Sequence, residues 1–102
     1  MRKITKESAT ALLNGEHYKK DNMLVVGGHY QLHGHEIVEL ANNALYLDSC
    51  GWFTVTTKER LNGVLSVFNT GLKIVQRDFE WFIIDKTNKL TPFYNQMKIK
   101  LN

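Results

Sequence analysis

The chain has 102 residues, 43% of them hydrophobic and 11% aromatic, which suits one domain built around one core. No apolar run is longer than that from Trp81 to Ile84, which is far shorter than the roughly 20 residues of a membrane-spanning helix. No apolar segment follows the basic N-terminus, and the single cysteine, Cys50, excludes an internal disulfide. We therefore expect a single small domain over residues 1–102 that resides in a cytoplasm and does not enter a membrane.

The formal net charge is +3, and the ends of the chain are basic while its middle is acidic. Residues 1–20 carry a net positive charge, and the C-terminal extension, residues 86–102, carries lysines and no acid. If the two ends meet on one face, they form a basic patch suited to phosphates or to an acidic protein surface. Otherwise they are solvated side chains at the chain ends. The residues of such a patch are Arg2, Lys3, Lys98 and Lys100.

A first helix is predicted over residues 5–14. Thr5 is placed to cap its N-terminus, and Ile4 and Ala9 have the spacing of a hydrophobic staple. Gly15 supplies the stop signal after the last helical residue.

Short apolar segments separated by turn residues follow from Asn22. This pattern indicates strands joined by tight turns, and consecutive hairpins form an antiparallel meander. The predicted strands are 23–26, 30–32, 37–40 and 44–47.

A second helix of about two turns is predicted from Thr56 to Gly63, because Thr56 and Glu59 have capping-box spacing and Gly63 offers a left-handed exit. Strands follow, and the one at 79–84 is apolar on both faces, so we expect it to be central and covered on both sides. The fold class is α+β, a curved antiparallel sheet of meander hairpins packed by two short helices. These later strands are 64–68, 72–75, 79–84 and an edge strand at 97–101.

One long motif carries a resemblance to a known family. Residues 51–63 read Gly-Trp-Phe-Thr-Val-Thr-Thr-Lys-Glu-Arg-Leu-Asn-Gly, with Leu32-His33-Gly34 before them and Trp81 after them. This arrangement resembles a family of small domains encoded by tailed bacteriophages, over residues 5–84. Members of the family end soon after a Trp-Tyr-Leu-Asn-Gly stretch, whereas this chain continues beyond residues 81–85. The resemblance implies a phage origin but no activity, and it assigns no catalytic or binding residue.

No catalytic constellation is evident. Cys50 has no activating signature around it, so we expect a small core thiol. Glu36 and Glu39 are expected on opposite faces of one strand, which would separate them. Gly27-Gly28 lacks the lysine and helix of a phosphate-binding loop. The sequence predicts a protein that is not an enzyme and uses no cofactor.

Three histidines, His29, His33 and His35, lie close together in the sequence, and with Cys50 or His17 they offer ligands for zinc. Their spacing does not fit a standard zinc finger, and a hairpin brings imidazoles together without a metal. We predict no metal site and leave the role of these histidines open.

The residues around the second helix have two interpretations. Trp52 and Phe53 can stack bases while Lys58 and Arg60 neutralise phosphates. Alternatively, the aromatic pair forms a core wedge under the helix, with Arg60 paired to neighbours at Glu59 or to Asp48. The core interpretation is favoured for Trp52. Arg60 is the better candidate for contacting a partner, since a guanidinium pairs with carboxylate or phosphate through two hydrogen bonds. The candidate partner contacts are Trp52, Lys58 and Arg60.

Together these patterns predict a non-enzymatic phage protein that binds and modulates a host protein in the host cytoplasm, for example by inhibiting a host defence system. The alternative is a nucleic-acid-binding accessory protein that uses the basic termini and Arg60. A homodimer formed through the C-terminal edge strand is a further prediction.

Overall fold

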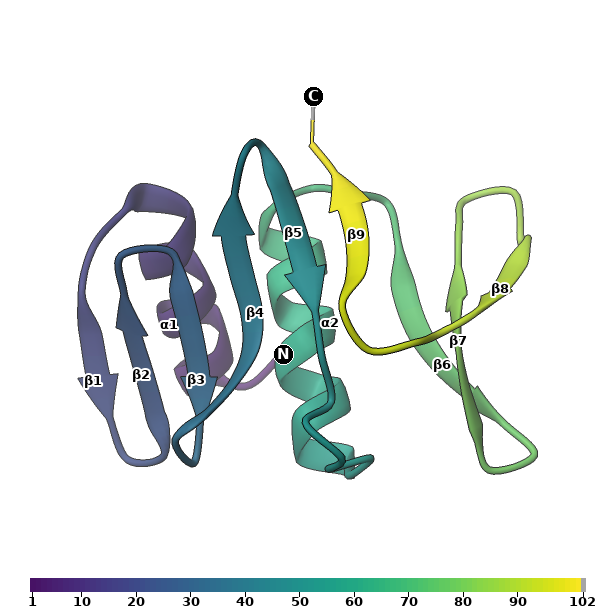
Figure 1. The fold of residues 1–102 in the computed structure, drawn as a ribbon, viewed down its shortest axis with the longest axis horizontal. Coiled ribbons are helices and arrows are strands. Elements are labelled where there is room, and N and C mark those ends of the chain that lie inside the picture. Colours follow the sequence, from purple (N-terminus) through teal and green to yellow (C-terminus); the bar gives the residue numbers. More distant parts are fainter. Residues whose placement is uncertain (102) are drawn as a thin grey trace.

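Two helices and nine strands are present in residues 1–101, which are the residues described by this computed structural model (Figure 1). Asn102, the last residue of the predicted domain and of the basic extension, lies outside the described residues. The strands form two antiparallel sheets, so the α+β class predicted from the sequence is confirmed. The elements are α1 (Lys3–Asn14), β1 (Tyr18–Lys20), β2 (Met23–Val26), β3 (His29–Leu32), β4 (His35–Ala41), β5 (Ala44–Leu47), α2 (Val55–Val67), β6 (Lys73–Arg77), β7 (Glu80–Ile84), β8 (Leu90–Pro92) and β9 (Met97–Lys100).

The larger sheet has six strands in the order β1-β2-β3-β4-β5-β9. The predicted meander forms β2 to β5, and the predicted C-terminal strand pairs with β5 and lies at the edge. Strand β1 was not predicted, because Tyr18–Lys20 is mostly polar and is held by backbone pairing to β2.

Both helices pack on the same face of this sheet and against each other (Figure 1). Helix α1 covers β1–β3, and α2 packs on β4 and β6. Side chains alternate along each strand, so in β9 Met97 and Ile99 are buried while Lys98 and Lys100 point to the other side. We call this other side, against which no helix of residues 1–101 packs, the open face.

Helix α1 begins earlier than predicted. Arg2 holds the N-cap position without a side-chain hydrogen bond, and Thr5 lies fully buried inside the helix. The prediction of Thr5 as a cap was therefore wrong, because its hydroxyl forms hydrogen bonds with Glu59 and Arg60 of the other helix. Gly15 ends the helix in the left-handed region, at φ 70°, as predicted.

Helix α2 is longer than its predicted limits. Thr54 caps it by accepting a hydrogen bond from the Thr57 amide at 3.1 Å, so the predicted capping box of Thr56 and Glu59 was wrong. Gly63 lies inside the helix, and the strand predicted at 64–68 continues that helix. A Cβ added at Gly63 would lie 2.1 Å from Cγ2 of Thr5, so this glycine permits close helix packing.

The smaller sheet has the order β6-β7-β8, and β7 is central as predicted. Trp81 and Ile83 are buried, whereas Phe82 and Ile84 on its other face are only half-buried. Phe79 lies in the preceding turn at φ 66° and is almost fully exposed. The prediction of a strand covered on both sides was therefore wrong for residues 79–84.

A β-bulge interrupts the pairing of β3 with β4. Tyr30 pairs with Val38 and Gln31 pairs with Glu36, which leaves Ile37 as the extra residue. Ile37 and Val38 are both buried. Glu36 and Glu39 therefore both project from the open face, and the prediction that they lie on opposite faces was wrong.

Candidate functional site

The segment after β5 is a tightly hydrogen-bonded loop that carries Trp52 and Phe53. The Asp48 carboxylate accepts from the Cys50 amide at 2.7 Å, and the Ser49 hydroxyl accepts from the Gly51 amide at 3.1 Å. The Trp52 amide donates to the Ser49 carbonyl at 2.8 Å. These local bonds hold the loop in one shape although Cys50 has a positive φ.

A second segment, between β8 and β9, is tied to this loop. The Asn95 side-chain oxygen accepts from both the amide and the hydroxyl of Ser49, each at 2.9 Å. The Gln96 side chain donates to the Asp48 carboxylate at 2.5 Å. Residues far apart in the sequence are thus held together beside the exposed aromatic side chains.

An aromatic cluster surrounds Trp81. Phe53 and Phe93 each pack against Trp81 in a T-shaped arrangement, with ring centroids 4.9 Å and 5.5 Å from that of Trp81. Phe53 is 56% exposed and Phe79 is 95% exposed, and both line a shallow hollow of 360 Å³. We call Phe53, Phe79, Trp81, Phe82 and Phe93 the aromatic surface.

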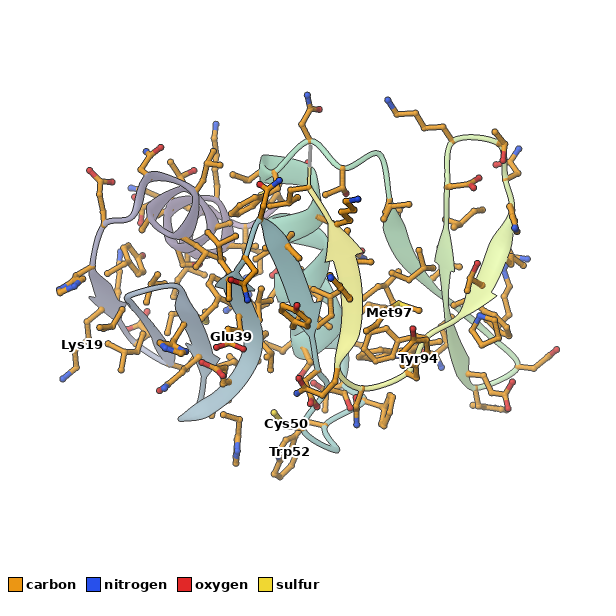
Figure 2. The ribbon with its side chains drawn as sticks, turned by 45° about the horizontal axis from the view of Figure 1, so that its top comes forward. Lys19, Glu39, Cys50, Trp52, Tyr94 and Met97 are labelled. Atoms are coloured by element: carbon orange, nitrogen blue, oxygen red, sulfur yellow. The ribbon has the colours of Figure 1, made fainter. Side chains whose placement is uncertain are left out.

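Trp52 lies next to this surface and opens onto a different hollow. Its side chain is 54% exposed and its ring centroid lies 5.8 Å from that of His35. Figure 2 shows Trp52 beside Cys50, projecting away from the ribbon. The prediction of Trp52 as a core wedge under the helix was wrong, because the hydrogen-bonded loop turns the indole outward. The hollow, of 430 Å³, is lined by Leu32, His33, His35, Ile37, Ser49, Trp52, Thr54, Thr56 and Thr57.

Arg60, the sequence-based candidate for a partner contact, is only 1% exposed. Its guanidinium donates to the Thr5 hydroxyl at 2.9 Å and to the Glu59 carboxylate at 2.5 Å, so its acidic partner is Glu59 and not the alternative, Asp48. The Thr5 hydroxyl donates in turn to Glu59 at 2.5 Å. Because Arg60 joins the two helices, a direct contact with a partner does not fit its position.

Lys58, the third sequence-based candidate, is half-buried on the outer side of α2. It lines a groove of 580 Å³ together with Asn62 and Lys73, whereas Trp52 lines the hollow at the start of that helix. The structure therefore does not bring Trp52 and Lys58 to one hollow.

The four basic residues of the two termini lie on opposite faces of the larger sheet. Arg2 and Lys3 are at the start of α1, on the helix-covered side, where the Arg2 amide donates to Glu59 at 3.3 Å. Lys98 and Lys100 project from the open face. The structure does not bring them together as one patch.

The Cys50 thiol has the environment of an unreactive cysteine. Burial and the neighbouring Asp48 carboxylate raise its pKa, and its sulfur donates to the Glu36 carbonyl at 3.1 Å. The reactive form of cysteine is the thiolate, which a raised pKa disfavours at neutral pH.

The histidines do not gather as the zinc alternative required. His35 packs against Trp52, and His33 contacts the Asn22 side chain at 3.4 Å. Within residues 1–101, the one group of three potential metal ligands whose donor atoms converge consists of His29, Glu36 and Glu39. Sequence reasoning missed this group because the β-bulge, which aligns the two glutamates, leaves no clear signal in the residue pattern.

Glu59 links folding stability to pH. Burial raises the pKa of Glu59, but hydrogen bonds from Thr5, Arg2 and Arg60 outweigh this effect and hold the pKa below its ordinary value. Because the pKa of Glu59 is lower in the folded state, the carboxylate stabilises the fold at pH values above the unfolded-state pKa of ~4.3. This stability is lost as the pH falls through the folded-state pKa.

We therefore expect Glu59→Gln to lose less stability than the parent protein between pH 7 and pH ~3, as measured by urea unfolding at each pH. Glu16→Gln, at an exposed position, is the matched control and should lose as much as the parent protein. An unchanged acid dependence in Glu59→Gln would contradict the assigned role.

Neither helix in residues 1–101 is long and apolar enough to cross a membrane.

No curated protein and no solved structure matches the chain. A family model described as Kyanoviridae Gp96 protein matches residues 1–100, which is nearly the whole chain. The match agrees with the phage origin that the motif at residues 51–63 implied. The chain belongs to the Kyanoviridae Gp96 family of bacteriophage proteins.

Proposed function

We propose that this phage protein acts without catalysis, by binding a host protein in the host cytoplasm through Trp52 and the aromatic surface. The observation that carries the proposal is the exposure of Trp52, Phe53 and Phe79, at 54%, 56% and 95%. Contiguous exposed apolar surface on a small protein is typical of an interaction site, and tryptophan is enriched among the residues that dominate binding energy.

The hydrogen bonds of the loop support the same proposal. A binding surface that is already ordered loses less conformational entropy on association. Ser49 and Asn95 join the two segments that carry Trp52, Phe53 and Phe93. The aromatic side chains therefore project from a backbone that does not have to be ordered by the partner.

Binding to a host protein suits the rest of the molecule. The raised pKa of Cys50 does not favour nucleophilic catalysis. For a small protein of a phage family, binding can block a host defence system or redirect a host enzyme, and inhibition of defence is the role we propose.

The positions of the charges favour a protein partner over nucleic acid. Single-strand binders place cations beside their stacking rings. Here Arg60 is buried, Lys58 faces another groove, and an acid, Glu80, lines the aromatic hollow.

The free edge of β9 bears on the predicted homodimer. Lys98 and Lys100 lie on the same face of β9. If two β9 strands paired antiparallel with their buried faces on the same side, the lysines of one copy would lie opposite those of the other and repel them. Lysines on an edge strand are a common protection against such pairing. We therefore propose binding by the monomer.

The test uses one pair of matched variants in capture experiments from host lysate, with and without nuclease. We expect the parent protein to retain a stoichiometric host protein after nuclease treatment. Phe79→Ser should weaken the affinity for that protein by about tenfold or more, because the exposed ring contributes contact area but little to the fold. Affinity is measured by titrating the purified host protein.

Leu13→Ser is the control, because Leu13 is also exposed but lies on α1, at 47%. It should bind as the parent protein does. Recovery of nuclease-sensitive material alone would favour the nucleic-acid alternative, and equal affinity of the Phe79→Ser variant would exclude the aromatic surface as the site.

A further inference from the structure

A group of three potential metal ligands lies on the open face of the larger sheet, on β3 and β4. His29 is directly opposite Glu39 in the strand register, and the β-bulge turns Glu36 to the same side. One donor atom from each of the three side chains lies within 4.8 Å of the other two. Nδ1 of His29 already contacts the Glu36 carboxylate. Figure 2 marks Glu39 on β4.

The two carboxylates of this group have no basic partner from lysine or arginine. Within residues 1–101, no such side chain lies within 4.0 Å of Glu36 or Glu39. Apart from His29 itself, the residues paired with them on neighbouring strands are Gln31 and Tyr46, and neither side chain is a cation. Two carboxylates held this close repel each other, and a bound cation would remove the repulsion.

We propose that His29, Glu36 and Glu39 form a divalent transition-metal site that takes Zn²⁺. An imidazole nitrogen and carboxylate oxygens are ligands that zinc uses in proteins, and three protein ligands leave a fourth position for water or for a side chain of a partner. A site made of nitrogen and oxygen ligands binds Zn²⁺ more tightly than it binds Mn²⁺, so zinc should be the more tightly bound of the two ions.

The geometry needs only a small adjustment to receive the ion. Zinc–ligand bonds of about 2.0–2.2 Å place tetrahedral donors about 3.4 Å apart. The side chains of His29 and Glu36 are 47% and 38% exposed, so they can move by this amount without disturbing the core. The backbone of paired strands fixes where each ligand starts.

The experiment is a calorimetric titration of metal-free protein with ZnCl₂ at pH 7. We expect one zinc ion per chain, weaker binding of MnCl₂, and a loss of zinc affinity of at least about tenfold in His29→Gln and in Glu39→Gln, since even outer-shell changes cost about 10–100-fold. The control variant combines His33→Gln, His35→Gln and Cys50→Ser, which removes the other soft ligands nearby. It should keep the affinity of the parent protein.

A second measurement separates binding from folding. Zinc should raise the thermal midpoint of the parent protein and of the control variant, because a ligand that binds only the folded state stabilises it, but not that of Glu39→Gln. The absence of saturable zinc binding, unchanged affinity in Glu39→Gln, or lost affinity in the control variant would each overturn the proposal. In the first case the group would be only a histidine–carboxylate ion pair.

Discussion

Replacing Arg60 with methionine should lower the free energy of unfolding by about 3 kcal/mol. The change leaves the Glu59 carboxylate and the Thr5 hydroxyl without the guanidinium that joins them at the contact between α1 and α2. Removing one member of a buried charged pair typically costs about 3–5 kcal/mol. The lower end applies here, because the Glu59 side chain is 26% exposed and because Nε of Arg60 has no hydrogen-bond partner within residues 1–101.

Urea unfolding at pH 7 measures this loss, and two further variants make it specific. Arg77→Met, at an exposed position, should change stability by no more than about 0.5 kcal/mol. The combination Arg60→Met with Glu59→Gln should recover part of the loss, because no charge is then left unpaired. Equal stability of the Arg60→Met and Arg77→Met variants would show that the buried network does not hold the helices together.

Replacing Gly63 with alanine should destabilise the protein by about 2 kcal/mol, although alanine is the better helix former. The added Cβ would lie 2.1 Å from Cγ2 of Thr5, a fully buried side chain with little room to move away. Overpacking of this kind costs up to about 3 kcal/mol, and the higher helix propensity of alanine offsets about 1 kcal/mol.

The same contact offers a rescue experiment. Thr5→Ser removes the methyl group that meets the new Cβ but keeps the hydroxyl that bonds to Glu59. The double variant should therefore be more stable than the sum of the two single changes predicts, by about 2 kcal/mol in urea unfolding. Ser66→Ala, on the exposed side of α2, controls for helix propensity. Additive effects of Thr5→Ser and Gly63→Ala would mean that the helices can separate at this contact at little cost.

Local sequence signals were sufficient for strands β2 to β5 and for the number of helices. The meander over residues 23–47 was predicted because turn residues separate short apolar segments, and both helices were placed within a few residues of their observed positions. The errors fall where a contact between distant segments decides the role of a residue. Locally, Gly63 resembles a helix stop signal, but it lies inside a helix where α2 contacts Thr5, which is far away in the sequence.

The candidate site was only partly predictable, for a similar reason. The motif around Trp52 was noted in the sequence, but the exposure of an aromatic side chain depends on hydrogen bonds such as that between Ser49 and Asn95, which join distant segments. The burial of Arg60 depends on the packing of α1 against α2, which no local pattern reveals. The alignment of Glu36 with Glu39 depends on one extra residue in β4.

The pairing of β9 with β5 also sets an order of assembly. The strands from β1 to β5 are joined by short turns, so their contacts are local and can form as soon as residues 18–47 are available. The register that pairs Ala44 with Lys100 spans the whole of α2 and the smaller sheet, so closing it carries a larger entropy cost. Until that late step, β5 is an unprotected edge that another chain can pair with, and the final strand therefore protects the folding protein against aggregation.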